Sequence, residues 1–75
     1  MLLEQCKGGR AMLGWSQERL AKASKVALRT LADFESGARQ PYDRTLADIR
    51  RALEDAGIVF IDPNGGGPGV RLKGS

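Results

Sequence analysis

The sequence contains no histidine and only one cysteine, Cys6, among its 75 residues. Without histidine, the commonest general acid–base and nucleophilic sites cannot be built, and zinc sites lose most of their usual ligands. A single cysteine forms no internal disulfide, which suits a reducing cytosol. We therefore expect no catalytic residue, no metal site and no cofactor, and we predict that the protein is not an enzyme. We interpret Cys6 as a small buried apolar residue.

Two patterns that resemble catalytic or phosphate-binding motifs have simpler interpretations. The adjacent carboxylates Glu54 and Asp55 are typical of a solvated helix face. The glycine run at 65–67 opens no helix and lacks the Lys-Ser/Thr pair of a phosphate loop. The sequence also lacks a membrane-length apolar run and a recognisable signal peptide, so we expect a cytoplasmic protein without membrane association.

Chain length and net charge limit the number of domains and the kinds of partner that we expect. With 75 residues the chain has room for one domain. A chain of this size buries only about 60% of its unfolded surface, so oligomerisation would add stability. The net charge of +3 agrees with a nucleic-acid partner without requiring one.

The stretch 16–37 predicts two short helices joined by a tight turn. Ser16 is an N-cap residue type, whose hydroxyl can accept from the free backbone N–H groups of the first turn. In the second helix, Leu31 and Phe34 recur at i, i+3 spacing. Gly37 follows them at a position where helices commonly end. A helix, a three-residue turn and a second helix form a helix-turn-helix, whose second helix enters the DNA major groove.

Two further helices are expected on either side of this stretch. The first covers 3–13 and contains the pair Gly8–Gly9, which costs about 1 kcal/mol per glycine relative to alanine. The other begins at Asp43 or Thr45 and continues to about Ala56. The sequence alone shows no packing reason for the two glycines.

After Gly57 the periodicity changes to that of strands. The run 58–61 is β-branched and aromatic, and 70–73 alternates, with a glycine-rich connection between them. The simplest arrangement is a hairpin, and an isolated two-stranded hairpin is barely stable in water. We therefore expect it to pack on the helices or to pair with a second copy, the alternative being a disordered or back-folded tail. For a two-fold homodimer, the expected contact residues are Ile58, Val59, Phe60, Ile61, Val70 and Leu72.

These elements predict a mainly α fold, a compact four-helix domain with a short C-terminal β-hairpin. We divide the chain into a helix-turn-helix domain, 1–57, and a C-terminal hairpin or tail, 58–75, that could serve in dimerisation.

The central residues resemble the lambda-repressor and Cro family of helix-turn-helix regulators, the xenobiotic-response-element (XRE) class. The resemblance spans 3–53 and also favours small bacterial members with a G-V-x-F-type strand after the last helix. It rests on W-S-Q-E-R-L-A at 15–21 and F-E-S-G at 34–37, together with Arg10, Val26, Thr30, Leu31 and Pro41. It implies a dimeric, cytoplasmic and nucleoid-associated regulator of transcription, a repressor or an activator, that binds double-stranded DNA. Small members often control mobile elements.

The resemblance also implies roles for particular residues. Arg10 and Glu35 correspond to a structural ion pair between the first helix and the recognition helix, 27–36. Arg29 is the best candidate for bidentate reading of guanine. The implied base-contacting residues are Ala27, Leu28, Arg29 and Asp33. The implied DNA-backbone contacts are Ser16, Gln17, Lys25, Thr30, Ser36, Arg39 and Arg44.

Three positions depart from the family pattern. Lys25 replaces the usual turn glycine, and a left-handed lysine costs about 1 kcal/mol. Ala27 replaces the usual Ser or Thr cap, a loss of about 1 kcal/mol. Asp33 adds negative charge on the recognition helix. These departures support an alternative function, a protein-interaction module such as an antitoxin or antiactivator, with a regulatory protein partner.

Overall fold

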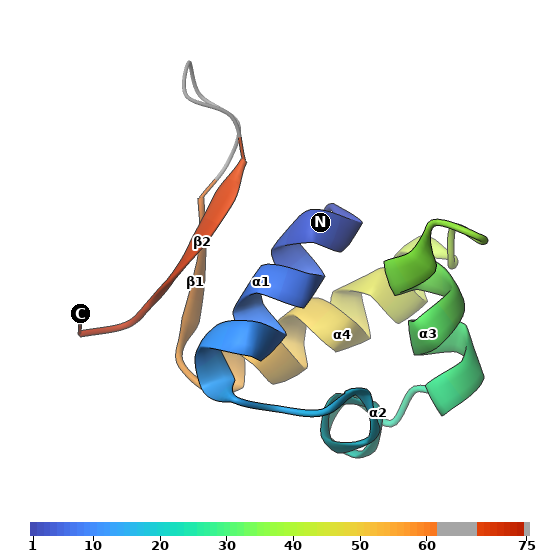
Figure 1. Ribbon diagram of the computed structural model, residues 1–75, viewed down its shortest axis with the longest axis horizontal. Coiled ribbons are helices and arrows are strands. Elements are labelled where there is room, and N and C mark those ends of the chain that lie inside the picture. Colours follow the sequence, from blue (N-terminus) through green and yellow to red (C-terminus); the bar gives the residue numbers. More distant parts are fainter. Residues whose placement is uncertain (62–67, 75) are drawn as a thin grey trace.

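The computed structural model describes residues 1–61 and 68–74, which form four helices followed by a two-stranded antiparallel sheet (Figure 1). This is the mainly α architecture with a C-terminal hairpin that the sequence predicts. The elements are α1 (Leu3–Leu13), α2 (Gln17–Ser24), α3 (Leu28–Ser36), α4 (Asp43–Asp55), β1 (Ile58–Ile61) and β2 (Gly69–Leu72).

The core lies where the four helices meet. Each helix contributes at least one side chain that solvent does not reach: Cys6, Leu20, Leu31, Ile49 and Leu53. Burying one large aliphatic side chain is worth about 1.5–3 kcal/mol, so these residues provide much of the driving force for folding. The interpretation of Cys6 as a buried residue is confirmed.

The ends of α2 and α3 follow from local chemistry. The Ser16 Oγ accepts a hydrogen bond from the Arg19 N–H at 3.1 Å, which caps α2. Lys25 ends this helix in the left-handed conformation, with φ of 60°. Ala27 precedes α3 without any side-chain cap, and Gly37 ends it with φ of 81°. The turn between α2 and α3 therefore contains a left-handed backbone conformation that glycine adopts at little cost, and Lys25 occupies that position.

The hairpin pairs β1 with β2 in antiparallel register. Ile58 lies opposite Leu72, and Phe60 lies opposite Val70. The second strand covers Gly69–Leu72, so it begins and ends one residue earlier than the predicted strand 70–73. The expected glycine-rich connection falls on 62–67, outside the described residues.

The hairpin packs against the helices of its own chain, and the glycine pair in α1 makes this possible. A Cβ atom at Gly8 would lie 3.2 Å from Val70 Cγ2, and one at Gly9 would lie 3.4 Å from Ile58 Cγ2. Both distances are at or below ordinary contact, so the strands approach α1 where it has no side chains. Packing of the hairpin on the helices, one of the two arrangements that the sequence predicts for it, is confirmed for the described strand residues.

Gln5 adds a polar connection between α1 and the hairpin. Its Nε2 donates to the carbonyls of Ile61 and Gly69, at 3.3 and 3.1 Å, and its Oε1 accepts from the Leu2 N–H at 2.9 Å. The amide is buried and has partners on both of its ends. It therefore fixes the last residue pair of the sheet to the start of α1.

Candidate nucleic-acid interface

Helix α3 has one buried side and one exposed side. Leu31, Phe34 and Glu35 face the other helices and are at most 4% exposed. Arg29 and Asp33, four residues apart, lie on the opposite side; Arg29 is exposed and Asp33 is half-buried. This side presents hydrogen-bond donors and an acceptor, which are the groups that read base edges.

The start of α3 adds apolar surface next to these groups. Ala27 and Leu28 are both exposed, and the Leu28 side chain retains 42% of its accessible surface. Aliphatic side chains at this end of a recognition helix can contact the methyl group of thymine. The structure thus places Leu28, Arg29 and Asp33 on one short helix, directly after Ala27.

The residues expected to contact the DNA backbone lie in and around α3. They differ in exposure and in whether their polar side-chain atoms already take part in hydrogen bonds. The Ser16 hydroxyl accepts from Arg19 N–H, which leaves its own O–H available. The Ser36 Oγ donates to the Asp33 carbonyl at 3.1 Å and accepts from the Ala38 N–H at 3.3 Å, so its donor is already used. Lys25, Arg39 and Arg44 are exposed, while Gln17 and Thr30 are half-buried.

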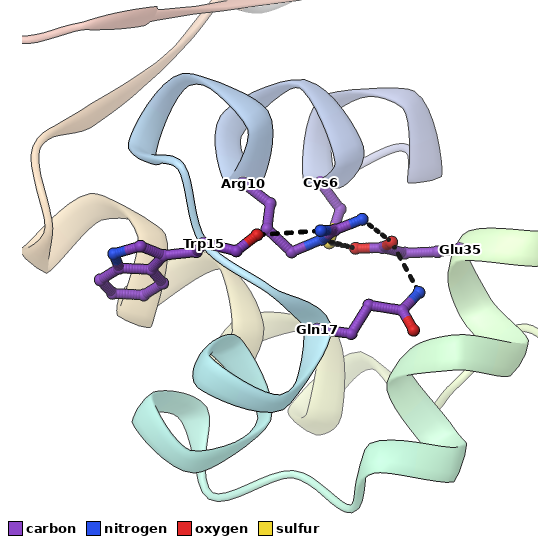
Figure 2. Close-up of polar contacts among 5 residues, drawn as sticks. All are labelled: Cys6, Arg10, Trp15, Gln17 and Glu35. Atoms are coloured by element: carbon purple, nitrogen blue, oxygen red, sulfur yellow. Dashed lines mark hydrogen bonds and ion pairs between the residues drawn. The ribbon is translucent and has the colours of Figure 1, made fainter.

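A buried polar cluster holds α3 in place (Figure 2). Arg10 and Glu35 form a bidentate ion pair, with Nη2 2.8 Å from Oε1 and Nε 3.0 Å from Oε2. The remaining Arg10 amino group donates to the Trp15 carbonyl at 2.9 Å. The Glu35 side chain is only 3% exposed. One arginine therefore connects α1, the start of α2 and α3.

Two further residues donate to the same carboxylate, and neither contact was expected from the sequence. Gln17 Nε2 lies 3.0 Å from Glu35 Oε1, and Cys6 Sγ lies 3.2 Å from Oε2. Cys6 and Arg10 are four residues apart on α1, a spacing that predicts a shared face. Nothing in the local sequence around Gln17 indicates that its amide turns toward Glu35.

The electrostatics of the cluster follow from these contacts. Burial alone would raise the pKa of Glu35, but hydrogen bonds from Arg10, Gln17 and Cys6 and the arginine charge hold that pKa below its ordinary value. The bond to Glu35 raises the pKa of Arg10. Burial raises the pKa of the Cys6 thiol far above its ordinary value, so Cys6 remains a neutral donor. The cluster is thus a charged pair with every carboxylate oxygen satisfied.

Two hollows flank α3. One, of about 450 Å³, lies between α3 and the segment leading to α4 and is lined by Thr30, Arg39, Gln40, Pro41, Tyr42 and Thr45. The other, of about 520 Å³, lies between α2 and α3 and has a mainly apolar surface, lined by Glu18, Ala21, Lys22, Lys25, Val26, Ala27 and Leu28.

The six residues expected at a dimer contact divide between the two faces of the hairpin. Ile58 is 2% exposed and lies in the core of its own chain. On the same face, Val70 lies over Gly8, and the Arg50 guanidinium stands 4.7 Å from the centre of the Phe60 ring. Val59 and Ile61 alternate to the other face, where Ile61 is 43% exposed. Leu72, opposite Ile58, is half-buried.

The described residues contain neither a membrane-spanning helix nor a cluster of metal-binding side chains. Over 1–61 and 68–74, no helix combines the length and apolar character that crossing a bilayer requires. In the same residues, no three Cys, Asp or Glu side chains gather in a group that could hold a metal ion.

Comparison with known families gives one result for the region just described. A family model described as "Helix-turn-helix" matches residues 9–54. The match contains the whole of α2 and α3, most of α4 and the C-terminal part of α1. A search of curated proteins finds no similar sequence.

Proposed function

The chain belongs to the lambda-repressor-like helix-turn-helix family of DNA-binding domains, and we propose that it is a sequence-specific, dimeric regulator of transcription. Each protomer places α3 in the major groove of one half-site, and the half-sites lie about one helical turn apart. The observation that carries the proposal is the exposed side of α3, with Arg29 and Asp33 held outward by the buried contacts of Glu35.

Base reading is assigned to the first two turns of α3. Arg29 donates to guanine O6 and N7, and Asp33 accepts from a cytosine amino group. Ala27 and Leu28 contact a thymine methyl group. Discrimination between bases then depends on one cation, one anion and a small apolar surface.

Contacts to the DNA backbone position the helix without reading sequence. Gln17 uses one amide N–H on Glu35 and keeps the second for a phosphate at the start of α2, where the helix dipole also favours an anion. Thr30 and Arg39 line the hollow beside α3, and we assign both to a neighbouring phosphate. The other proposed backbone contacts are Ser16, Lys25 and Arg44, together with Ser36, whose hydroxyl would have to turn away from the Asp33 carbonyl to donate to a phosphate.

The hairpin supplies the contact between protomers. It is anchored to α1 through Gln5 and the glycine pair, so a partner bound to the hairpin has a defined position relative to α3. A regulator of this kind acts on chromosomal DNA, and we place it in the cytoplasm, associated with the nucleoid.

Selection of tight binders from a library of random duplexes tests this proposal. We expect the selected sequences to share a two-fold symmetric motif with half-site centres about 10–10.5 base pairs apart. A library that converges on no motif, or on a single unsymmetric site, would contradict it.

A protein-interaction module remains the second candidate, and the apolar hollow between α2 and α3 favours it. A regulatory protein seated there would cover Ala27 and Leu28 and use the surface that we assign to DNA. Replacing Arg29 distinguishes the two functions, because it removes a base contact and leaves the lining of this hollow unchanged.

A further inference from the structure

The hollow between α2 and α3 combines an apolar surface with exposed cations. Ala21 and Val26 form part of its lining, next to Leu28, whose side chain retains 42% of its accessible surface. Lys22 and Lys25 also line it and are exposed. In the part of the chain that the structure describes, neither lysine belongs to an ion pair. A lining of this kind suits a ligand that is apolar at its centre and negatively charged at its edge.

The chain gives up stability at two positions that both line this hollow. Lys25, with φ of 60°, is the one non-glycine among the described residues in the left-handed region, which glycine adopts without strain. Ala27 precedes α3 without a side-chain cap, although serine or threonine there would bond a free N–H of the first turn. Unfavourable local choices gather at functional sites, so the added charge and the added apolar surface indicate that the hollow has a function.

The shape of the hollow favours a protein segment over a small molecule. Its volume of about 520 Å³ is within the range of ligand pockets, about 300–1,000 Å³, but it is shallow and open to solvent. A small ligand there would keep much of its surface in water, whereas pockets for small molecules bury most of that surface. A protein segment can insert one apolar side chain and cover the surrounding helix surface with its own main chain.

We propose that this hollow binds a segment of another protein in which one bulky apolar side chain is flanked by aspartate or glutamate. The apolar side chain lies against Val26 and Leu28, and the carboxylates pair with Lys22 and Lys25. Glu18, one helical turn before Lys22, also lines the hollow and repels a carboxylate at that end. The segment therefore has a direction, with its acidic residues toward the turn between α2 and α3.

A bound segment competes with DNA. The proposed function assigns Ala27 and Leu28 to base contacts and Lys25 to a phosphate, and the segment covers the same residues. The competition rests on the proposed function, whereas binding of the segment rests on the hollow alone. In Figure 1 the turn between α2 and α3 lies away from the hairpin, across the helices, so the proposed contact between protomers stays available.

Selection of random peptides displayed on phage, with the full wild-type chain as the target, tests the chemistry of the ligand. We expect the selected sequences to share a leucine, methionine, phenylalanine or tryptophan next to a group of acidic residues. A library that yields no binder, or that yields binders without acidic residues, would overturn the proposal.

Substitutions at two exposed residues of the hollow test where a selected peptide binds. Lys22→Glu reverses a charge that the acidic residues need, so we expect it to weaken binding of a fluorescent peptide by about tenfold or more. Lys7→Glu, the same change at an exposed position on α1, is the matched control and should change binding by about twofold or less. Leu28→Ser should weaken binding by about tenfold, whereas Met12→Ser, at a similarly exposed residue of α1, should not. Equal effects within either pair would overturn the site.

Competition against the selected duplex tests the overlap with DNA. We expect the peptide to displace DNA from the wild-type protein and to do so less well from Lys22→Glu. A stable complex of peptide, protein and duplex would contradict the placement over Ala27 and Leu28. Self-association that Lys22→Glu abolishes in sedimentation would put a second copy in the hollow and would also overturn the proposal.

Failure of this inference and failure of the proposed function give different results. Specific DNA binding by a protein that selects no peptide would remove only the docking site. Peptide binding that depends on Lys22, by a protein that does not discriminate between duplexes, would remove only the proposed function.

Discussion

Glu35 is the residue on which the position of the recognition helix depends. Its carboxylate accepts hydrogen bonds from Arg10 and Cys6 of α1 and from Gln17 of α2. These donors come from two other helices, so the contacts fix α3 relative to both. The Glu35 side chain is 3% exposed, so removing either partner of the pair would leave a poorly solvated charge without its counter-ion.

Glu35→Ala is therefore expected to destabilise the fold by about 3–5 kcal/mol, because it leaves the Arg10 guanidinium without its partner. Urea unfolding followed by circular dichroism measures this loss. The matched control is Glu54→Ala, which breaks the exposed Arg50–Glu54 pair and is expected to cost about 1 kcal/mol or less. Equal effects of the two substitutions would contradict a structural role for Glu35.

Arg29 is the residue on which base reading depends. We expect Arg29→Ala to keep the fold, because Arg29 is exposed, and to lose about 1–3 kcal/mol of binding to the preferred duplex. The loss should be specific to one base position, measured by fluorescence anisotropy with duplexes altered one pair at a time. Lys7→Ala, an exposed cation on α1, is the control for net charge. A uniform loss over all duplexes would identify Arg29 as a phosphate contact instead.

At the scale of elements, the packing of the hairpin on α1 explains a feature that appears unfavourable in the sequence. Two adjacent glycines weaken a helix by about 1 kcal/mol each. In the folded protein they allow Ile58 and Val70 to lie directly on the helix backbone. The cost in helix propensity is offset by the burial of the strand side chains.

Substitution of Gly9 measures that contact. An alanine Cβ at Gly9 would lie 3.4 Å from Ile58 Cγ2 and 3.6 Å from Leu53 Cδ2, a fit that requires little movement. We expect Gly9→Ala to change stability by about 1 kcal/mol or less, since helix propensity improves. Gly9→Leu is expected to cost about 1–3 kcal/mol or more, because it forces Ile58 out of place. Equal thermal midpoints for the two variants would show that the hairpin does not need this surface.

The elements that could be predicted from the sequence are those with local causes. Ser16 caps α2 through a bond within one turn, whereas the left-handed end at Lys25 was expected only from the family resemblance, which places a glycine at that position. The strand at 58–61 and its partner were recognisable from side-chain type, with an error of one residue at Gly69. The need for Gly8 and Gly9 could not be predicted, because the side chains that pack on them belong to strand residues about fifty or more positions away.

The candidate site also contains features that could be predicted from the sequence and features that could not. The exposed side of α3 follows from the periodicity of its buried residues, so the placement of Arg29 and Asp33 was predictable. The contacts of Gln17 and Cys6 with Glu35 were not, because they require three helices to be in position first. Gln5 is a similar case, since its partners are main-chain carbonyls of the hairpin.

At the scale of the whole molecule, we assign different roles to the helices and to the hairpin, and the packing of the hairpin on α1 holds the two parts together. The helices present α3, and the hairpin packs on α1. Gln5 and the glycine pair couple the two parts, so in the proposed dimer a contact through the hairpin would set the spacing between two copies of α3. A chain of 75 residues would gain stability from such pairing as well.

The measurement that tests the central claim most directly compares the selected duplex with a scrambled duplex of the same length and composition, at low and at physiological salt. A sequence-specific regulator predicts at least about a thousandfold discrimination that persists at physiological salt. Equal binding to both duplexes that disappears as salt rises would mean that the protein is attracted only to phosphate, and it would contradict the claim.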